Sequence, residues 1–128
     1  MNMKDERQFV GYSKYRSRLV DGHVHTELCP HGSGDRTALM IEKAIELRIE
    51  KVCLTEHVPL PKAFAAEYGG DQKAYDTASL KLNQVDTYLE LGRQLQRAYG
   101  THIDISLGFE VDYIPGFETD IQEFLDRY

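Results

Sequence analysis

The sequence predicts an α/β fold in which a parallel sheet is covered by helices. Extended segments alternate along the chain with segments whose apolar residues recur at helical spacing, in the order βαβαβα. No internal repeat or low-complexity segment interrupts this order. The length of 128 residues suits one domain rather than two. With 41% hydrophobic and 28% charged residues, the composition is that of a globular domain with a packed core.

The first predicted strand begins at Leu19, after a polar, basic arm over residues 1–18. Strand alternation places Val20 and Val24 on one side, and the polar set on the other side is Asp21, His23 and His25. A loop rich in proline, glycine and serine follows. A helix is expected over about 37–48, capped by Asp35 or Thr37. Its apolar stripe is Ile41, Ala44, Ile45 and Ile49.

The second predicted strand covers residues 52–55 and ends before Pro59, which cannot continue a central ladder. Residues 58–76 form a long connection. It is interpreted either as a lid or binding segment, or as a packed surface loop with a helical turn around 62–68. A long amphipathic helix is expected over 77–99, with Gly100 ending it in a left-handed conformation.

The third predicted strand runs from His102 to Tyr113 and alternates strictly. One face carries Ile103, Ile105, Leu107, Phe109 and Val111, and the other carries Asp104, Ser106, Gly108, Glu110 and Asp112. A final helix is expected over 119–128. Its predicted buried stripe is Ile121, Phe124 and Leu125.

Charge and cysteine content exclude several classes of function. The net charge is −6, which argues against general binding to nucleic acid or to an anionic membrane. No apolar run approaches the ~20 residues of a membrane span. The polar N-terminus has no signal-peptide core, so a cytoplasmic protein is expected, with Cys29 and Cys53 reduced.

Polar side chains with metal-ligating chemistry collect where the predicted strands end. Because parallel strands end at one edge of a sheet, residues there meet in space. Imidazole and carboxylate together suit zinc, iron or manganese, and a carboxylate can bridge two ions. The alternative is that these are ordinary polar strand-end residues. The five candidate ligands are His23, His25, His31, His57 and Glu110.

Four further residues have two interpretations each. Asp21 either hydrogen-bonds a ligand imidazole or is an interior polar residue. Asp35 either orients the loop ligand or caps a helix. Cys29 is either a soft-metal ligand or a structural thiol. His102 lies at the start of the third strand, at the opposite edge, and is expected to be structural or exposed.

Several common catalytic motifs are missing from the sequence. It has no glycine-rich phosphate loop followed by Lys-Ser/Thr, no G-x-S-x-G elbow and no C-x-x-C pair. Asp112 and Glu118 are too loosely related to Glu110 to suggest a glycosidase pair. Nucleophilic serine or cysteine catalysis therefore has no support.

Three motifs resemble the polymerase-and-histidinol-phosphatase (PHP) family of metal-dependent phosphoesterases, and most closely its histidinol-phosphate phosphatases. The motifs are Asp21-Gly-His-Val-His-Thr-Glu-Leu-Cys-Pro-His-Gly-Ser-Gly-Asp35, Leu54-Thr-Glu-His-Val-Pro59 and Gly108-Phe-Glu-Val-Asp-Tyr113. The resemblance implies a distorted (β/α)7 TIM-like barrel with up to three divalent ions, Zn, Fe or Mn. It assigns residues 19–128 to a partial PHP domain holding the first three βα units.

The resemblance also implies a role for each candidate ligand. His23, His25 and Glu110 would bind one ion, Glu110 would bridge to a second, and His31 and His57 would hold the third. The family's later ligands and phosphate-gripping arginines have no counterpart in these residues. A related eight-unit barrel takes roughly 250 residues, so this chain is expected to be about an N-terminal half. Its uncovered strand edge favours self-association or pairing with the missing half.

The function implied is hydrolysis of a phosphate monoester, with histidinol phosphate, a histidine-biosynthesis intermediate, as the expected substrate. One alternative is a nonenzymatic metal-binding or oligomer-forming remnant of the fold. Another is the PHP module of a DNA polymerase or nuclease. The stretch from Cys29 to Asp35 and the lack of basic clusters argue against the latter.

Overall fold

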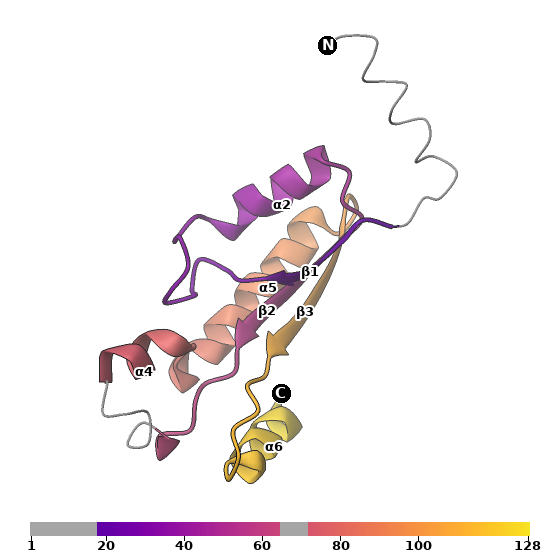
Figure 1. Cartoon of the computed structure of the whole chain (residues 1–128). Helices are drawn as coiled ribbons and strands as arrows, with labels where there is room; N and C mark the ends of the chain where they lie inside the picture. Colours follow the sequence, from indigo (N-terminus) through magenta and orange to yellow (C-terminus); the bar gives the residue numbers. More distant parts are fainter. Residues whose placement is uncertain (1–17, 65–71) are drawn as a thin grey trace, which may run out of the picture.

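A computed structural model of the chain describes residues 18–64 and 72–128. Three parallel strands form one sheet in the order β1-β2-β3, which confirms the predicted α/β fold. The 1–17 part of the predicted arm and residues 65–71 of the long connection lie outside the described residues. The elements are β1 (Val20–Val24), α2 (Thr37–Glu46), β2 (Lys51–His57), α4 (Gln72–Ala78), η2 (Leu82–Gln84), α5 (Val85–Tyr99), β3 (Asp104–Glu110) and α6 (Glu118–Arg127) (Figure 1).

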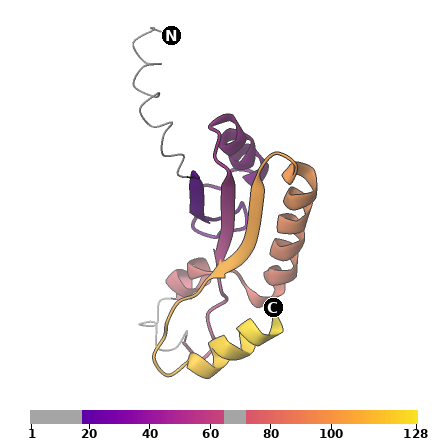
Figure 2. The ribbon, with the colours of Figure 1, turned by 90° about the vertical axis from the view of Figure 1, so that its right-hand side faces the viewer.

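Helices α2 and α5 lie along one face of the sheet (Figures 1 and 2). Strand β2 alternates between buried and half-buried residues, so Val52 and Leu54 point toward these helices. The core is made where the strands meet the helices, from Ile41, Ala44, Val52, Leu54, Leu80, Tyr88, Leu95, Ile103 and Ile105. No helix in residues 18–64 and 72–128 is long and apolar enough to cross a bilayer.

The register between β2 and β3 is continuous and sets which polar residues face one another on the uncovered side. Lys51 pairs with Asp104 at the start of the strands, and His57 pairs with Glu110 at their carboxyl ends. Paired residues of neighbouring strands share a face. The third strand, Asp104–Glu110, is shorter than the expected 102–113. The chain leaves the sheet after Glu110, and Val111 is exposed.

A register shift in β1 corrects the expected alternation of its side chains. Asp21 pairs with Val52 and Val24 pairs with Leu54, so β1 uses one more residue than β2 between these points, as in a β-bulge. Val52 and Leu54 both face the helices. Val20 and Val24 therefore do not share a face, and Asp21 is out of phase with His23.

The predicted helix over 77–99 is wrong at its beginning. The chain makes a separate short helix, α4, and α5 starts only at Val85. Between them Ser79 is buried and its Oγ accepts the Leu60 N–H at 3.2 Å, while Leu80 is buried in the core. Because both residues are buried, the chain between α4 and α5 does not continue as one helix.

Two helix ends also differ from expectation. α2 stops at Glu46, and Arg48 just beyond it adopts the left-handed conformation with φ 59°. Gly100 ends α5 with φ −63°, so it is not the left-handed cap that was predicted. A Cβ at position 100 would lie 2.4 Å from the Gln96 carbonyl oxygen, and this close approach explains the glycine.

The final helix, α6, has no buried residue, which contradicts the predicted buried stripe. Leu125 is 41% exposed. Phe124 is half-buried, and its ring packs edge-on against that of Phe109 in β3 with centroids 5.2 Å apart.

We expect Tyr88→Phe to lower the free energy of unfolding by about 1–3 kcal/mol, the range for losing a buried hydrogen bond. The buried Tyr88 hydroxyl donates to the Gly108 carbonyl at 2.6 Å and so ties α5 to β3. Urea unfolding of both proteins measures the difference. The matched control is Tyr113→Phe, since Tyr113 is 76% exposed. Equal effects of the two substitutions would contradict the assignment.

Tyr88 also predicts how stability depends on alkaline pH. Burial raises the pKa of Tyr88 from 10.0 to about 12, and the nearby Glu56 carboxylate acts in the same direction. The folded state therefore keeps a proton that the unfolded chain loses, and stability falls as the pH rises from 10 to about 12. The difference in unfolding free energy between wild type and Tyr88→Phe should shrink over this range. A difference that stays constant would show that Tyr88 does not titrate abnormally.

Candidate metal centre

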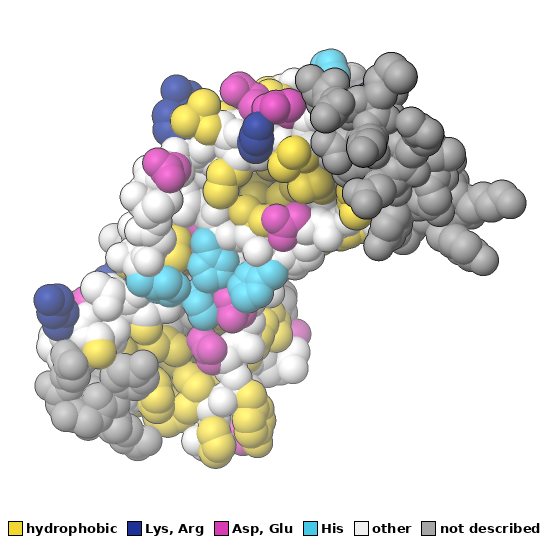
Figure 3. Space-filling model, turned by 45° about the horizontal axis from the view of Figure 1, so that its top comes forward, with side chains coloured by type: hydrophobic (Ala, Val, Ile, Leu, Met, Phe, Trp, Pro, Cys, Tyr) yellow, Lys and Arg dark blue, Asp and Glu magenta, His cyan; other side chains and the backbone are white. Residues whose placement is uncertain are grey.

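Four histidines and one glutamate gather at the carboxyl end of the sheet. His23 lies near the end of β1 and His25 follows that strand, His31 lies in the loop before α2, and His57 and Glu110 are the last residues of β2 and β3. Figure 3 shows histidine side chains clustered beside acidic ones on one face of the molecule. The fifth histidine, His102, is exposed, lies two residues before β3 and contacts the Thr101 hydroxyl.

One carboxylate oxygen, Oε2 of Glu110, is the point on which three imidazoles converge. It lies 2.7 Å from Nε2 of His23, 2.9 Å from Nε2 of His25 and 3.3 Å from Nε2 of His57. The two nitrogens of His23 and His25 are themselves only 3.1 Å apart. In the absence of an ion, protons shared among these nitrogens and the carboxylate oxygen can hold them together, and a divalent cation could take the place of those protons.

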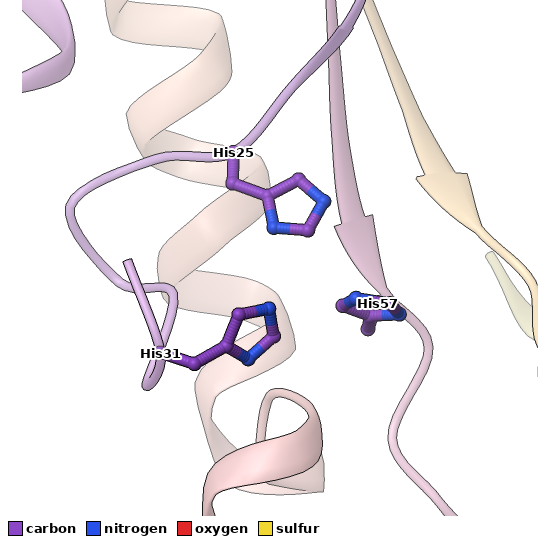
Figure 4. Close-up of side chains that lie close together, drawn as sticks. All are labelled: His25, His31 and His57. Carbon is purple, nitrogen blue, oxygen red and sulfur yellow. The ribbon is translucent and has the colours of Figure 1, made fainter. Parts of the chain in front are cut away.

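His25, His31 and His57 form a second, overlapping group, with their rings turned toward one another (Figure 4). The ring centroids of His25 and His57 are 4.9 Å apart, and those of His31 and His57 are 5.3 Å apart. One ligand atom from each residue lies within 4.8 Å of the others. Three imidazole nitrogens at this spacing could hold one divalent ion.

His31 is oriented by the backbone of α4. Its Nδ1 lies 2.8 Å from the Thr77 carbonyl oxygen. A carbonyl only accepts hydrogen bonds, so Nδ1 carries the proton and a neutral ring leaves its Nε2 lone pair free. A residue of α4, which follows β2 in the chain, thus orients His31, which precedes β2.

His57 has one nitrogen ready for a ligand. Its Nδ1 is buried and has no hydrogen-bond partner, although Asp112 Oδ2 lies 3.3 Å away outside hydrogen-bond geometry. A buried polar atom without a partner costs free energy and is often explained by an ion. Asp112, for which no metal role was predicted, is therefore close enough to influence the site.

The surroundings of Glu110, at the centre of the cluster, favour its ionised form. Partial burial acts to raise the pKa of Glu110, but hydrogen bonds from His25 and His23 and the nearby charge of His57 outweigh it, and the net effect lowers the pKa. An ionised carboxylate among imidazoles is the donor set that zinc, iron or manganese accepts. The residues present therefore fit a divalent metal centre.

Glu56 is a site residue that the sequence reasoning missed. It is fully buried on the helix-covered side of β2, and its Oε1 accepts the Thr26 N–H and hydroxyl, both at 2.6 Å. It belongs to a third group of possible ligands, with His25 and Cys29. The available signal was a charged residue at an otherwise apolar position of the alternating pattern in β2.

Cys29 lies behind His25, where its Sγ is 3.3 Å from Nδ1 of that ring. Burial raises the pKa of the Cys29 thiol, and the charges of Glu56 and Glu110 act in the same direction. A neutral thiol is a poor metal ligand, because the thiolate is the ligating form. Without an ion the Cys29 thiol is therefore held protonated, but a bound ion would deprotonate a coordinating thiol, so both interpretations of Cys29 stay predictions.

The two predicted supporting aspartates do not reach an imidazole in the structure. Asp21 Oδ1 accepts the backbone N–H of His23 at 3.4 Å, a consequence of the irregular register of β1. Asp35 Oδ2 accepts the Ser33 hydroxyl at 2.9 Å. Roles for Asp21 and Asp35 toward the ligand histidines remain predictions without a contact to support them.

The first residue of α2 is held by a glutamate that was not predicted to contact it. Neither Asp35 nor Thr37 caps it; instead Glu27 Oε2 accepts both the N–H and the hydroxyl of Thr37 at 2.6 Å. Burial acts to raise the pKa of Glu27, but the hydrogen bonds from Thr37 outweigh it and lower the pKa. This contact closes the loop that carries Cys29 and His31.

A cavity of about 700 Å³ lies beyond the metal-ligand cluster, between the segment after β2, η2 and α6. Its walls are largely apolar, for example Pro59 and Phe124, with Lys62, Lys81 and Arg127 at its margin. None of the five candidate ligands lines it. The candidate chemistry therefore lies in the exposed histidine cluster rather than in this cavity.

Comparisons with known proteins agree with the motifs. Residues 21–127 match the model of the PHP domain. The chain is 39% identical over 108 residues to the histidinol-phosphatase of Bacillus subtilis, which covers 84% of this chain and 38% of that protein. It is 27% identical over 110 residues to a probable histidinol-phosphatase of Deinococcus radiodurans, covering 86% and 38%.

A solved structure is also similar. The crystal structure of hisK from Listeria monocytogenes, assigned as a histidinol phosphatase, superposes with a TM-score of 0.82 at 38% identity. The match covers 85% of this chain and 40% of that one. The chain thus spans well under half the length of the relatives that it matches.

We expect His57→Ala to weaken Zn²⁺ binding by at least about tenfold, since it removes a ring that contacts both histidine groups. Competition with a chromophoric chelator measures the affinity and the number of ions bound. His102→Ala is the matched control, because His102 lies at the other edge of the sheet. Equal Zn²⁺ affinity in wild type and His57→Ala would contradict the assigned centre.

Proposed function

Because the chain belongs to the PHP domain family, we propose that it carries part of the divalent-metal centre of a phosphomonoester hydrolase that acts on histidinol phosphate. The observation that carries the proposal is the convergence of three imidazole nitrogens on Oε2 of Glu110. The substrate is proposed from two relatives whose names state this activity. A biosynthetic enzyme for such a small phosphate ester would act in the cytoplasm.

In this proposal His23, His25 and Glu110 would hold one ion, Glu110 would also be a ligand of a second, and His31 and His57 would be ligands of a third. Zn, Fe or Mn fits this mixture of nitrogen and oxygen donors. When bound, such ions lower the pKa of a water molecule and neutralise phosphate oxygens.

The protein's own residues make the site accessible and fixed. The His23 side chain is 62% exposed, so a phosphate ester can approach this side of the cluster from solvent. The deeper residues, His25 and His57, are only 20% and 16% exposed, and their positions are held by packing. The exposed and the more buried ligands meet at Glu110, so ions held by its carboxylate would face a phosphate group that approaches from solvent.

We further propose that residues outside this chain complete the site. The chain spans 38% of the length of its two curated relatives, so the rest of those proteins can supply further ligands and phosphate contacts. Within the described residues, β1 and β3 each have one edge without a partner strand, and Leu19 and Val20 are more than half exposed. Self-association or pairing with a complementary segment would cover these edges.

The test measures phosphate release from histidinol phosphate by the Zn²⁺- or Mn²⁺-loaded chain. It is run alone and with the segment of the Bacillus subtilis relative that the match does not include. We expect release that a chelator abolishes, because the ions activate the water. His57→Ala should lower kcat/KM by at least about tenfold through loss of a ligand, while His102→Ala leaves it unchanged.

Two results would contradict this function. Metal binding without hydrolysis of any phosphate monoester, in every combination, would favour a nonenzymatic metal-binding module. Hydrolysis of a phosphodiester such as bis(p-nitrophenyl) phosphate in preference to histidinol phosphate would favour a nuclease-like role.

A further inference from the structure

The buried carboxylate of Glu56 has one satisfied oxygen and one unsatisfied oxygen. Oε1 accepts two hydrogen bonds from Thr26. Oε2 is buried and has no hydrogen-bond partner among the residues that the structure describes. A buried carboxylate oxygen without a hydrogen-bond partner costs free energy. The groups around Oε2 should therefore explain why this oxygen is buried.

The group in front of that oxygen is the far side of the His25 ring. Oε2 of Glu56 lies 4.0 Å from Nδ1 of His25, and Sγ of Cys29 lies 3.3 Å from the same nitrogen. One ligand atom from each of His25, Cys29 and Glu56 lies within 4.8 Å of the others. The other ring nitrogen, Nε2, faces Glu110 at 2.9 Å, in the proposed metal centre.

A neutral imidazole carries one proton, and its position decides which nitrogen can bind a metal. If the proton is on Nε2, the lone pair that should reach the ion is blocked. An acceptor beside Nδ1 keeps the proton there, which is how outer carboxylates orient metal-binding histidines. A carboxylate is an acceptor only, so Glu56 favours the proton on Nδ1, whereas Glu110, 2.9 Å from Nε2, favours the opposite tautomer when no ion is bound.

We propose that Glu56 is a positioning residue that acts through His25. Its carboxylate, together with the Cys29 sulfur, draws the proton of His25 to Nδ1, against the pull of Glu110 on Nε2, and so helps to free Nε2 for a divalent cation. Glu56 is anchored by the threonine that directly follows His25, so the same contact also fixes where the ring sits. The inference rests on the proposed metal centre, but its first readout uses neither metal nor substrate.

The three atoms behind His25 could themselves be considered a separate metal site. The geometry argues against this, because a proton on Nδ1 that is directed at Cys29 Sγ, 3.3 Å away, and favoured by the Glu56 charge 4.0 Å away leaves no lone pair there for an ion. An ion there would also use the ring whose opposite nitrogen faces Glu110. This arrangement is kept as an outcome of the test.

The test variant is Glu56→Gln, and the chain offers a closely matched control, Glu27→Gln. Both glutamates accept an N–H and a hydroxyl from one threonine, all at 2.6 Å, and both stabilise the loop between β1 and α2. Only Glu56 faces His25. In Glu56→Gln the amide oxygen can still accept from Thr26, which turns the amide NH₂ toward Nδ1 and opposes a proton there.

The first measurement is the tautomer of His25, from long-range ¹H–¹⁵N NMR correlations, in metal-free chains that carry Glu110→Ala. This substitution removes the competing acceptor that lies 2.9 Å from Nε2. On this background we expect the Nδ1–H form, with or without Glu27→Gln, and a shift toward the Nε2–H form when Glu56→Gln is added. A His25 that keeps its proton on Nε2 in the Glu110→Ala chain would overturn the proposal, even if no Glu56 variant folds. An unchanged tautomer in a folded Glu56→Gln protein would also overturn it.

The second measurement is Zn²⁺ affinity by chelator competition. We expect Glu56→Gln to raise the Kd by about 10–100-fold, the usual effect of removing an outer-shell partner, with Glu27→Gln unchanged. Equal losses in both variants would mean a purely structural role. A thiolate-to-metal charge-transfer band in the Co²⁺-loaded chain would show Cys29 to be a ligand and overturn the proposal. The proposed phosphatase activity can fail without changing either readout.

Discussion

The parallel pairing of β2 with β3 is the constraint on which the metal centre depends. It places His57 directly opposite Glu110 and on the same face, at the point where both strands end. The ladder before that point is continuous, and the helices bury its other face. The position of the Glu110 carboxylate is therefore fixed by the packing of the whole sheet. The imidazoles from β1 and its loop are then brought to a carboxylate that is already in place.

The loop between β1 and α2 is held by two similar contacts, each a threonine donating twice to one carboxylate. Thr37 donates to Glu27 and so joins the helix start to the beginning of the loop. Thr26 donates to Glu56 and so joins the loop to β2. These contacts replace the local helix cap expected from sequence. They give His25, Cys29 and His31 fixed positions although a loop of this kind has little regular hydrogen bonding of its own.

Some parts of the site were predictable because they follow from regular geometry. The alternation in β3 and the shared edge of parallel strands predicted that His57 and Glu110 would meet. The face of the strand on which Asp21 lies was predicted wrongly, because one extra residue in β1 moves the residues before it to the opposite face. Glu56 was missed because its partner, Thr26, belongs to another strand's loop. The beginning of α5 was missed because the burial of Ser79 and Leu80 overrides helical periodicity.

The sequence by itself determined the parallel α/β order and the family, and it named the five ligand candidates, since strand and helix periods and motif spacing are local properties of the chain. Tertiary structure alone decided how those residues meet. It determined which oxygen of Glu110 the three rings approach and, through the Thr77 carbonyl, which nitrogen of His31 carries the proton. It also placed Glu56 in a buried position behind His25. These are contacts between segments far apart in sequence, and only the packed sheet and its loops bring such segments within hydrogen-bond distance.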